Sequence, residues 1–303
     1  MLPLFLPWFE VILLLAGIVF SFCKKWKVVF TLIIIAIIVN WRAEVYPLNI
    51  CPSRDNGGNA CIKVMCFNID GTKEPINNRA VRISNLIFRE KPEILFVSEL
   101  GGVNKSILDS LLSFIYPYSL YSEQHCFYSK YPLSERARLG NEDINRIGVF
   151  KTFTFIERDT IVLYGCHFAS NNYTTDSKYI TPDSINNHTS LMQYISDIKI
   201  ASSNRTREAK ILAADLTNNQ KPVIVLGDMN DVGGSKTIRQ IEYVGFKDAW
   251  WEGGFGYGAT IHKPLPYRID HILYSGQFKL NRAKVVNSDG LSDHDAVFAE
   301  FSY

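Results

Sequence analysis

Asp228 and Asn230 follow an apolar run and carry the side chains needed to hold a water molecule and the group that it attacks. The run at 223–226 predicts a short buried strand, which Gly227 ends. Side chains two residues apart at a strand end point the same way, so a carboxylate and an amide would face one site. Gly, Asp and Asn are also turn formers, and the motif taken alone is better explained by a turn.

Similar motifs elsewhere in the chain give this one its chemical meaning. Apolar runs at 64–67, 94–97 and 161–166 each lead into a polar side chain, and two Asp–His pairs stand near the carboxyl end. These polar groups are Asn68, Asp70, Glu99, His167, Asp270 with His271, and Asp293 with His294. Functional groups at several strand ends indicate an active site built on a β-sheet.

The ordered series of motifs resembles the endonuclease/exonuclease/phosphatase superfamily, which includes DNase I-like nucleases, abasic-site endonucleases, sphingomyelinases and inositol-polyphosphate phosphatases. The resemblance covers residues 62–303, and the segment at 129–133 looks like the Ser-basic-x-Pro segment of that family. It implies an α/β fold, a four-layer α/β sandwich in which two mixed sheets pack face to face with helices outside. The active site would lie at one end of that sandwich, where strand ends meet.

The resemblance implies a divalent metal ion, because phosphoester hydrolysis needs the phosphate charge to be neutralised. Glu99 offers a hard oxygen donor that suits Mg²⁺, with Mn²⁺ as the alternative cofactor. Asn68 would add a carbonyl oxygen or orient Glu99, and Asp70 and Asp293 are further candidate ligands. The stretch at 68–71 also looks like the Asn-x-Asp-Gly motif of the abasic-site endonucleases.

The resemblance also implies the catalytic roles. The residue matching Asp228 activates or orients the attacking water, and Asn230 helps to fix it. The residue matching His294 contacts the phosphate and is paired with the carboxylate matching Asp270, which favours the imidazolium form. His167 matches the second histidine of the DNase I-like and sphingomyelinase branches, and is a candidate general acid for the leaving oxygen.

Other polar residues are predicted to take no part in catalysis. His271 stands next to Asp270, and strand neighbours point to opposite faces, so His271 is expected to be structural. The stretch at 191–216 is predicted to be helical, and its basic residues Arg205, Arg207 and Lys210 are expected to form a solvated face.

The amino-terminal segment differs in composition from the rest of the chain. Residues 4–22 are almost wholly apolar apart from Glu10, the lysine-rich stretch 24–27 follows, and residues 28–39 are apolar again. A signal peptide would carry its positive charge before the apolar run rather than after it. The sequence therefore predicts a transmembrane helical hairpin over residues 1–41, a linker over 42–61 and a catalytic domain over 62–303.

The lysines between the two apolar runs predict the orientation of such a hairpin. Positively charged loops stay in the cytoplasm, so the catalytic domain would lie on the extracytoplasmic side of the membrane. In an oxidising compartment Cys51 and Cys61 could form a disulfide, and two free thiols are an equally good alternative.

The balance of charge separates the classes of substrate. The chain has 32 Lys and Arg residues and 30 Asp and Glu residues, and the two numbers become equal once the amino-terminal segment is set aside. A neutral domain lacks the electrostatics that usually drive binding to nucleic acid. The sequence therefore favours a membrane-embedded phosphoesterase acting on a lipid headgroup or another small phosphoester. An extracytoplasmic nuclease is the alternative, and a non-catalytic receptor with the same fold is disfavoured by the complete set of catalytic groups.

Overall fold

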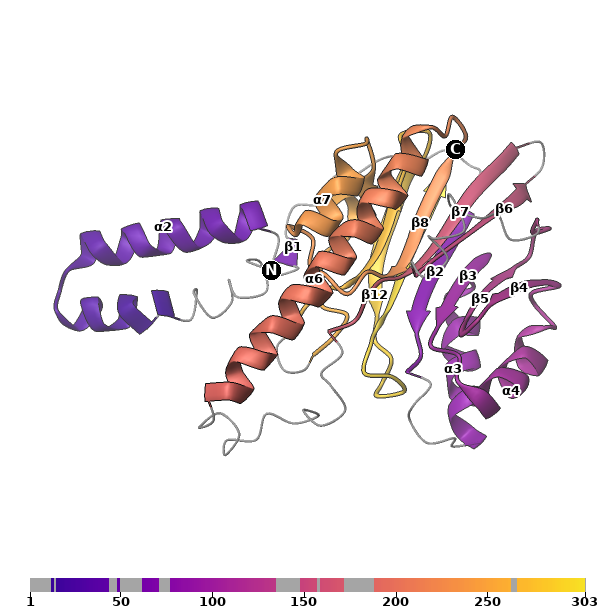
Figure 1. The fold of residues 1–303 in the computed structure, drawn as a ribbon, viewed down its shortest axis with the longest axis horizontal. Coiled ribbons are helices and arrows are strands. Elements are labelled where there is room, and N and C mark those ends of the chain that lie inside the picture. Colours follow the sequence, from indigo (N-terminus) through magenta and orange to yellow (C-terminus); the bar gives the residue numbers. More distant parts are fainter. Residues whose placement is uncertain are drawn as a thin grey trace.

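Runs of buried apolar residues form two β-sheets that pack face to face in the computed structural model (Figure 1). The structure describes residues 12–13, 15–43, 48–49, 62–70, 77–134, 148–156, 159–171, 188–262 and 266–302. Cys51 and Cys61, whose pairing the sequence left open, lie outside these residues, as do residues 172–187.

The first sheet has six strands in the order β12-β13-β2-β3-β5-β4. Their bounds are β2 Ile62–Asn68, β3 Ile94–Ser98, β4 Tyr118–Ser122, β5 His125–Ser129, β12 Lys279–Val286 and β13 Ala296–Ser302. Only β2 and β3 run parallel in this sheet. Their register pairs Asn68 with Ser98, which brings Glu99 to the same end of the sheet as Asn68.

The second sheet has five strands in the order β6-β7-β8-β11-β9. Their bounds are β6 Val149–Ile156, β7 Asp159–His167, β8 Val223–Asp228, β9 Lys247–Asp248 and β11 Asp270–Tyr274. In the register of this sheet, His167 on β7 and Asp270 on β11 both pair with Asp228 on the central strand β8. Three predicted catalytic residues therefore stand side by side at one edge.

Helices cover the outer faces of both sheets. Against the first sheet pack α3 (Asn77–Glu90) and α4 (Gly102–Leu112), and against the second pack α6 (His188–Thr217) and α7 (Lys236–Glu242). Period-two burial separates the layers, since Val64 and Cys66 of β2 face the other sheet while Met65 and Phe67 face the helices. The predicted α/β sandwich with mixed sheets is confirmed.

Gly227 allows β7 and β8 to approach closely just before the catalytic edge. Its φ is +133°, and a Cβ at this position would lie 2.1 Å from the carbonyl oxygen of Cys166. A side chain would therefore push His167 and Asp228 apart, which explains why the apolar run of β8 ends in glycine.

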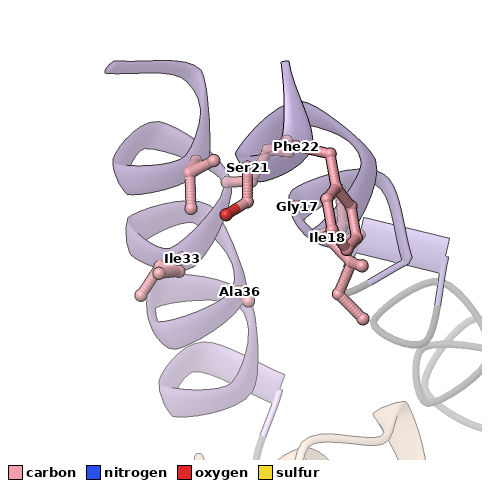
Figure 2. A pocket seen from close by; sticks show the side chains of 9 residues that line it. Gly17, Ile18, Ser21, Phe22, Ile33 and Ala36 are labelled. Atoms are coloured by element: carbon pink, nitrogen blue, oxygen red, sulfur yellow. The ribbon is translucent and has the colours of Figure 1, made fainter. Parts of the chain in front are cut away.

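The amino terminus folds into a helical hairpin that projects from one side of the sandwich (Figure 1). Residues 15–22 are helical, and α2 (Trp26–Ala43) runs back beside them. The two helices enclose an apolar cavity of about 360 Å³, lined by residues such as Ile18, Phe22 and Ile33 (Figure 2).

The transmembrane part of the prediction for this hairpin is not supported. Within the described residues, no helix combines the length and the apolar character that a membrane crossing requires.

A short ribbon fastens the segment after α2 to the catalytic domain. Strand β1 (Leu48–Asn49) pairs antiparallel with β10 (Gly256–Tyr257), and the Asn49 amide donates hydrogen bonds to the carbonyl oxygens of Trp250 and Trp251. Helix α8 (Ala249–Gly253) leads into β10, and the rings of Phe255 and Tyr257 are exposed.

Candidate active site

Strand ends from both sheets bring most of the predicted site residues together. Asn68 and Glu99 come from the first sheet, and Asp228 lies between its neighbours His167 and Asp270 in the second. His294 joins them from the loop before β13. One of the tertiary contacts between the two halves is a hydrogen bond of 3.1 Å from the Asn68 amide to Asp228 Oδ2.

Asp228 is the centre of this cluster. Its side chain is 2% exposed, and its Oδ2 lies 3.8 Å from His294 Nε2 and 4.0 Å from His167 Nε2. Asn68 Nδ2 donates to this oxygen and also to Glu99 Oε1 at 2.8 Å. The sequence left two roles open for Asn68, a metal ligand or a residue that orients Glu99. These hydrogen bonds fit the second role.

Burial shapes the protonation of Asp228. Removal from water is the largest effect and the negative charge of Asp270 is the next, and together they raise the pKa of Asp228 above its ordinary value. A carboxylate with a raised pKa is a stronger base than an exposed one. This property suits a group that takes a proton from water.

His294 forms a buried ion pair with Asp270, whose Oδ2 lies 2.8 Å from His294 Nδ1. Burial alone would lower the pKa of His294, but the carboxylates of Asp270 and Asp228 outweigh it and raise that pKa to about 10. The ring is therefore an imidazolium at neutral pH, with its Nε2–H directed toward the centre of the site.

Glu99 and His167 form a second, more open pair. His167 Nε2 lies 3.2 Å from Glu99 Oε1. Burial would raise the pKa of Glu99, but hydrogen bonds from His167 and Asn68 lower it to about 2. Burial would likewise lower the pKa of His167, and its bond to Glu99 with the charge of Asp228 raises it instead. Glu99 is therefore a carboxylate at neutral pH, and the His167 ring is protonated more readily than an exposed imidazole.

The family model for the endonuclease/exonuclease/phosphatase family matches residues 65–294, which include all of these side chains. The chain belongs to this family. Metal dependence and hydrolysis of phosphoesters are typical of the family, so the prediction of a hydrolytic phosphoesterase is confirmed at that level.

Solved structures of other proteins share the fold. Truncated TDP2 of Caenorhabditis elegans is 18% identical and superposes with a TM-score of 0.58, covering 82% of this chain and 100% of that one. A Bacteroides vulgatus family member is 15% identical with a TM-score of 0.59, covering 80% and 99%. Beta toxin of Staphylococcus aureus is 16% identical with a TM-score of 0.54, covering 78% and 99%. Among curated proteins, none matches this chain in sequence.

The donors of the site fit a divalent cation. In the described part of the chain, ligand atoms converge within 4.8 Å of one another in two groups, Glu99 with His167 and Asp228, and Asp228 with Asp270 and His294. Among the described residues, Asp270 Oδ1 is also buried and has no hydrogen-bond partner, so the site holds a carboxylate oxygen that these residues leave unsatisfied. Carboxylate oxygens are the ligands that Mg²⁺ prefers.

The two other predicted metal ligands lie beside these groups. Asp70 follows β2 in a left-handed conformation with φ +46°, and its backbone N–H donates to Asn68 Oδ1. Asp293 is exposed and accepts a hydrogen bond of 3.3 Å from Ser292 Oγ. Neither carboxylate belongs to the convergent groups of the described residues.

Asn230 holds two catalytic loops together. Its backbone N–H donates to Asp228 Oδ1 at 2.8 Å, and its side-chain amide donates to the Phe168 carbonyl oxygen at 3.0 Å. Asn230 and Glu99 both have left-handed backbones, with φ of +51° and +57°. Non-glycine residues in that region cost about 1–3 kcal/mol each and persist where the surroundings impose them, most often at functional sites.

His271 lies on the opposite face of β11, as predicted from strand alternation. It is fully buried, with Nδ1 2.8 Å from Asp248 Oδ2 and Nε2 2.9 Å from the carbonyl oxygen of Asp231. Arg268 donates to the same Asp248 oxygen. These groups form a structural cluster behind the site.

The prediction of a solvated face on α6 is wrong for Arg205, although Arg207 and Lys210 are exposed. Arg205 is 0% exposed. A signal was present in the sequence, because position 205 falls at helical spacing on the buried stripe of Ile198, Ala201, Ala209, Leu212 and Leu216. The sequence predicts no role for His125. In the structure its ring centroid lies 5.2 Å from that of His167.

Proposed function

We propose that this chain is a divalent-metal-dependent phosphoesterase that hydrolyses a lipid headgroup or another small phosphoester at a lipid surface. One observation carries the catalytic part of the proposal. Two histidine side chains, His167 and His294, approach the buried carboxylate of Asp228 from two sides, each within about 4 Å. A base and two proton donors are thereby held at one point.

The proposed cation is Mg²⁺, with Mn²⁺ as the alternative, held by Glu99 together with its neighbouring carboxylates. Such an ion neutralises the charge of the phosphate and polarises its P–O bond. Asn68 fixes Glu99 through its hydrogen bond, so the metal ligand is oriented before the ion arrives.

The side chains divide the remaining work of hydrolysis. Asp228 accepts a proton from the attacking water, with its pKa raised by burial. His294 donates a charged hydrogen bond to a phosphate oxygen, and its partner Asp270 keeps it protonated. His167 gives its proton to the leaving oxygen, which lies on the more exposed side of the cluster in this proposal.

The hairpin supports the lipid part of the proposal. Large apolar side chains are exposed on both of its helices, with Phe22 86%, Phe30 63% and Ile37 61% exposed. Four residues separate α2 from β1, and a chain of that length spans at most about 18 Å. The β1–β10 ribbon therefore keeps any lipid bound by the hairpin close to the catalytic domain, where Phe255 is also exposed.

The location of the domain on the extracytoplasmic side stays a prediction, which rests on the lysines at 24, 25 and 27. A cysteine placed beside Lys25 should stay unlabelled by an impermeant thiol reagent added to intact cells. Protease added to the same cells should digest the domain after Arg42. Labelling at Lys25 together with a protected domain would place the enzyme on the cytoplasmic side.

A nuclease activity is the second candidate. TDP2 of Danio rerio, with single-strand DNA product bound, shares the fold at 14% identity and a TM-score of 0.58, with 81% of this chain and 100% of that one covered. That likeness establishes the fold alone, and the balanced charge of this chain argues for a small substrate.

The deciding experiment compares substrates on the full-length protein in detergent with Mg²⁺. Sphingomyelin, phosphatidylinositol phosphates, a generic phosphodiester and plasmid DNA should be tested against Asp228→Asn as the inactive control. Hydrolysis of lipids or the small diester supports the proposal. Strong cleavage of DNA would favour the nuclease, and no metal-dependent hydrolysis of any phosphoester would reject both.

The role of the hairpin has its own test. Phe30→Glu with Ile37→Glu should release the protein from lipid vesicles and lower its rate on vesicle lipids, since attachment raises the effective substrate concentration. The rate on a soluble phosphodiester should stay unchanged. Vesicle binding equal to that of the unmodified protein would reject attachment through the hairpin.

The metal ligand can be tested separately. Glu99→Gln keeps the size of the side chain but removes its charge, so the Mg²⁺ concentration for half-maximal activity should rise about tenfold or more. An Mg²⁺ titration of activity measures this shift. An unchanged titration would remove Glu99 from the metal site.

A further inference from the structure

Helix α6 buries two charged side chains beneath the catalytic loops. Arg205 is 0% and Glu208 5% exposed, and neither takes a step in the proposed reaction. Burying a charge is costly unless hydrogen bonds or an opposite charge compensate for it. The groups that compensate the charges of Arg205 and Glu208 therefore indicate which parts of the structure these side chains fix in place.

Both side chains hold the loop that follows His167. Glu208 Oε2 accepts a hydrogen bond of 2.9 Å from the backbone N–H of Ala169. Arg205 Nη1 donates to the Ala169 carbonyl oxygen at 3.0 Å and to Asn171 Oδ1 at 2.8 Å. Both polar backbone groups of Ala169, two residues after His167, are thus bonded to α6.

Arg205 also reaches the loop that follows Asp228. Its Nε lies 3.5 Å from Asp231 Oδ2, an ion-pair distance between two fully buried side chains. The same Asp231 oxygen accepts a hydrogen bond of 2.7 Å from Thr237 Oγ1 on α7. The guanidinium therefore lies between the loop after β7 and the loop after β8.

The two loops are joined at the same level by one hydrogen bond between backbone groups and one from the Asn230 side chain. The Phe168 N–H donates to the Asp228 carbonyl oxygen at 3.0 Å, and the Asn230 amide donates to the Phe168 carbonyl oxygen at the same distance. Residues 168 and 169 are consequently fixed from both sides, by the Asp228 loop and by α6.

We infer that Arg205 and Glu208 are positioning residues that set His167 against Asp228. The inference rests on the proposed function, in which these two groups act on one phosphoester. A displacement of about 1 Å of a catalytic group can cost about a hundredfold in rate, so a buried clamp on the residues after His167 has a direct effect on turnover.

The central test is Arg205→Met in the full-length protein in detergent, which keeps most of the side-chain volume and removes the charge and the hydrogen bonds. With bis(p-nitrophenyl) phosphate and Mg²⁺, we expect kcat to fall about 10- to 100-fold while KM and the Mg²⁺ dependence stay within about twofold. Arg207→Met, an exposed arginine on the same helix, is the matched control and should leave kcat unchanged. Arg205→Lys should restore part of the loss, because a lysine still donates to Ala169.

Glu208→Met removes the second contact, the hydrogen bond from the Ala169 N–H to Glu208. It also serves as the test variant if Arg205→Met does not fold. It should also lower kcat. The fall in kcat of the double variant should be smaller than the product of the two single falls, because Arg205 and Glu208 hold the same loop. Folding is checked by Tm above the assay temperature. A kcat of folded Arg205→Met or Glu208→Met equal to that of Arg207→Met would overturn the inference, and so would a loss confined to KM.

Hydrogen exchange separates a failure of this inference from a failure of the proposed function. Amides 168–171 should exchange faster in Arg205→Met than in Arg207→Met, whatever the enzyme hydrolyses. If the unmodified protein has no phosphoesterase activity, the proposed function is rejected. If the exchange of these amides is unchanged in Arg205→Met, the positioning role of Arg205 and Glu208 is rejected.

Discussion

Two consecutive residues of β11 each belong to an Asp–His pair, and only one pair is built for chemistry. Asp270 binds His294 on one face of the strand, and His271 binds Asp248 on the other. The oxygen–nitrogen distance is 2.8 Å in both pairs, and all four side chains are buried. The residue types, distances and burial are the same, so the difference lies in what surrounds each pair.

The Asp248–His271 pair is saturated. Arg268 adds a positive charge and a hydrogen bond to Asp248, and the Asp231 carbonyl oxygen faces the second nitrogen of His271. Burial would raise the pKa of Asp248, but Arg268 and His271 hold it well below its ordinary range. A pair with every partner in place stabilises the fold and has no capacity left for a ligand.

The Asp270–His294 pair still has polar atoms that can bind a ligand. Asp270 Oδ1 is buried and has no hydrogen-bond partner in the part of the chain that the structure describes, and His294 Nε2 lies 3.8 Å from Asp228, beyond hydrogen-bond distance. A second carboxylate faces this pair where an arginine faces the other. A binding site is thus distinguished from a structural cluster by its unsatisfied groups rather than by its residue types.

Asp228→Asn should cause the largest fall in kcat at the catalytic cluster. The amide cannot accept a proton from water, so kcat should fall by about two to four orders of magnitude. Because the substitution conserves shape, Tm should stay within a few degrees. Steady-state kinetics of the purified variant with thermal unfolding checks both, and substantial activity in folded Asp228→Asn would remove this residue from the role of base.

His294→Ala should come next in effect. Loss of the charged donor should cost about 3 kcal/mol of transition-state stabilisation, or about a hundredfold in kcat. His294→Gln should recover a part of the activity, since glutamine still donates a hydrogen bond. A rate within about threefold of the unmodified enzyme in His294→Ala would show that the Asp270 pair does not act on the phosphate.

His271→Ala should have the opposite pattern, a loss of stability with little loss of turnover. Breaking a buried pair costs about 3–5 kcal/mol of unfolding free energy, which urea denaturation measures. The matched control is His262→Ala. His262 Nε2 lies 2.9 Å from Asp295 Oδ2, but its side chain is 56% exposed, so the cost should be below about 1 kcal/mol. A large fall in kcat per folded molecule for His271→Ala would mean that the two clusters are coupled.

The raised pKa of His294 predicts a dependence of stability on pH in the metal-free protein. The folded state holds its proton up to about pH 10, whereas the unfolded chain loses it near the ordinary value of 6.5. The stabilisation is therefore complete below about pH 6.5 and is lost as pH rises through about 10, by up to about 1.4 kcal/mol per pH unit. Unfolding by urea in the presence of a chelator should show this slope, and His294→Gln should reduce it. Equal slopes would show that His294 is not an imidazolium in the folded state.

Much of the fold and most of the site follow from local patterns in the chain. The sequence predicts a helix at 191–216, where α6 spans His188–Thr217. Period-two alternation on β11 separates Asp270 from His271 without any tertiary information. Parallel strands end at the same edge of a sheet, so polar residues after apolar runs were expected to meet.

The sequence by itself determined the strands, the order of the polar groups at their ends and the face to which each group points, because these depend on spacings of two to four residues. Only the tertiary structure decided which groups face each other across large separations in the chain. The bond from Asn68 to Asp228 joins two sheets across 160 positions, and Asp248 becomes the partner of His271 because β9 lies beside β11. The burial of Arg205 was decided in the same way, since a charged residue on a helix enters the interior only where two loops supply its partners.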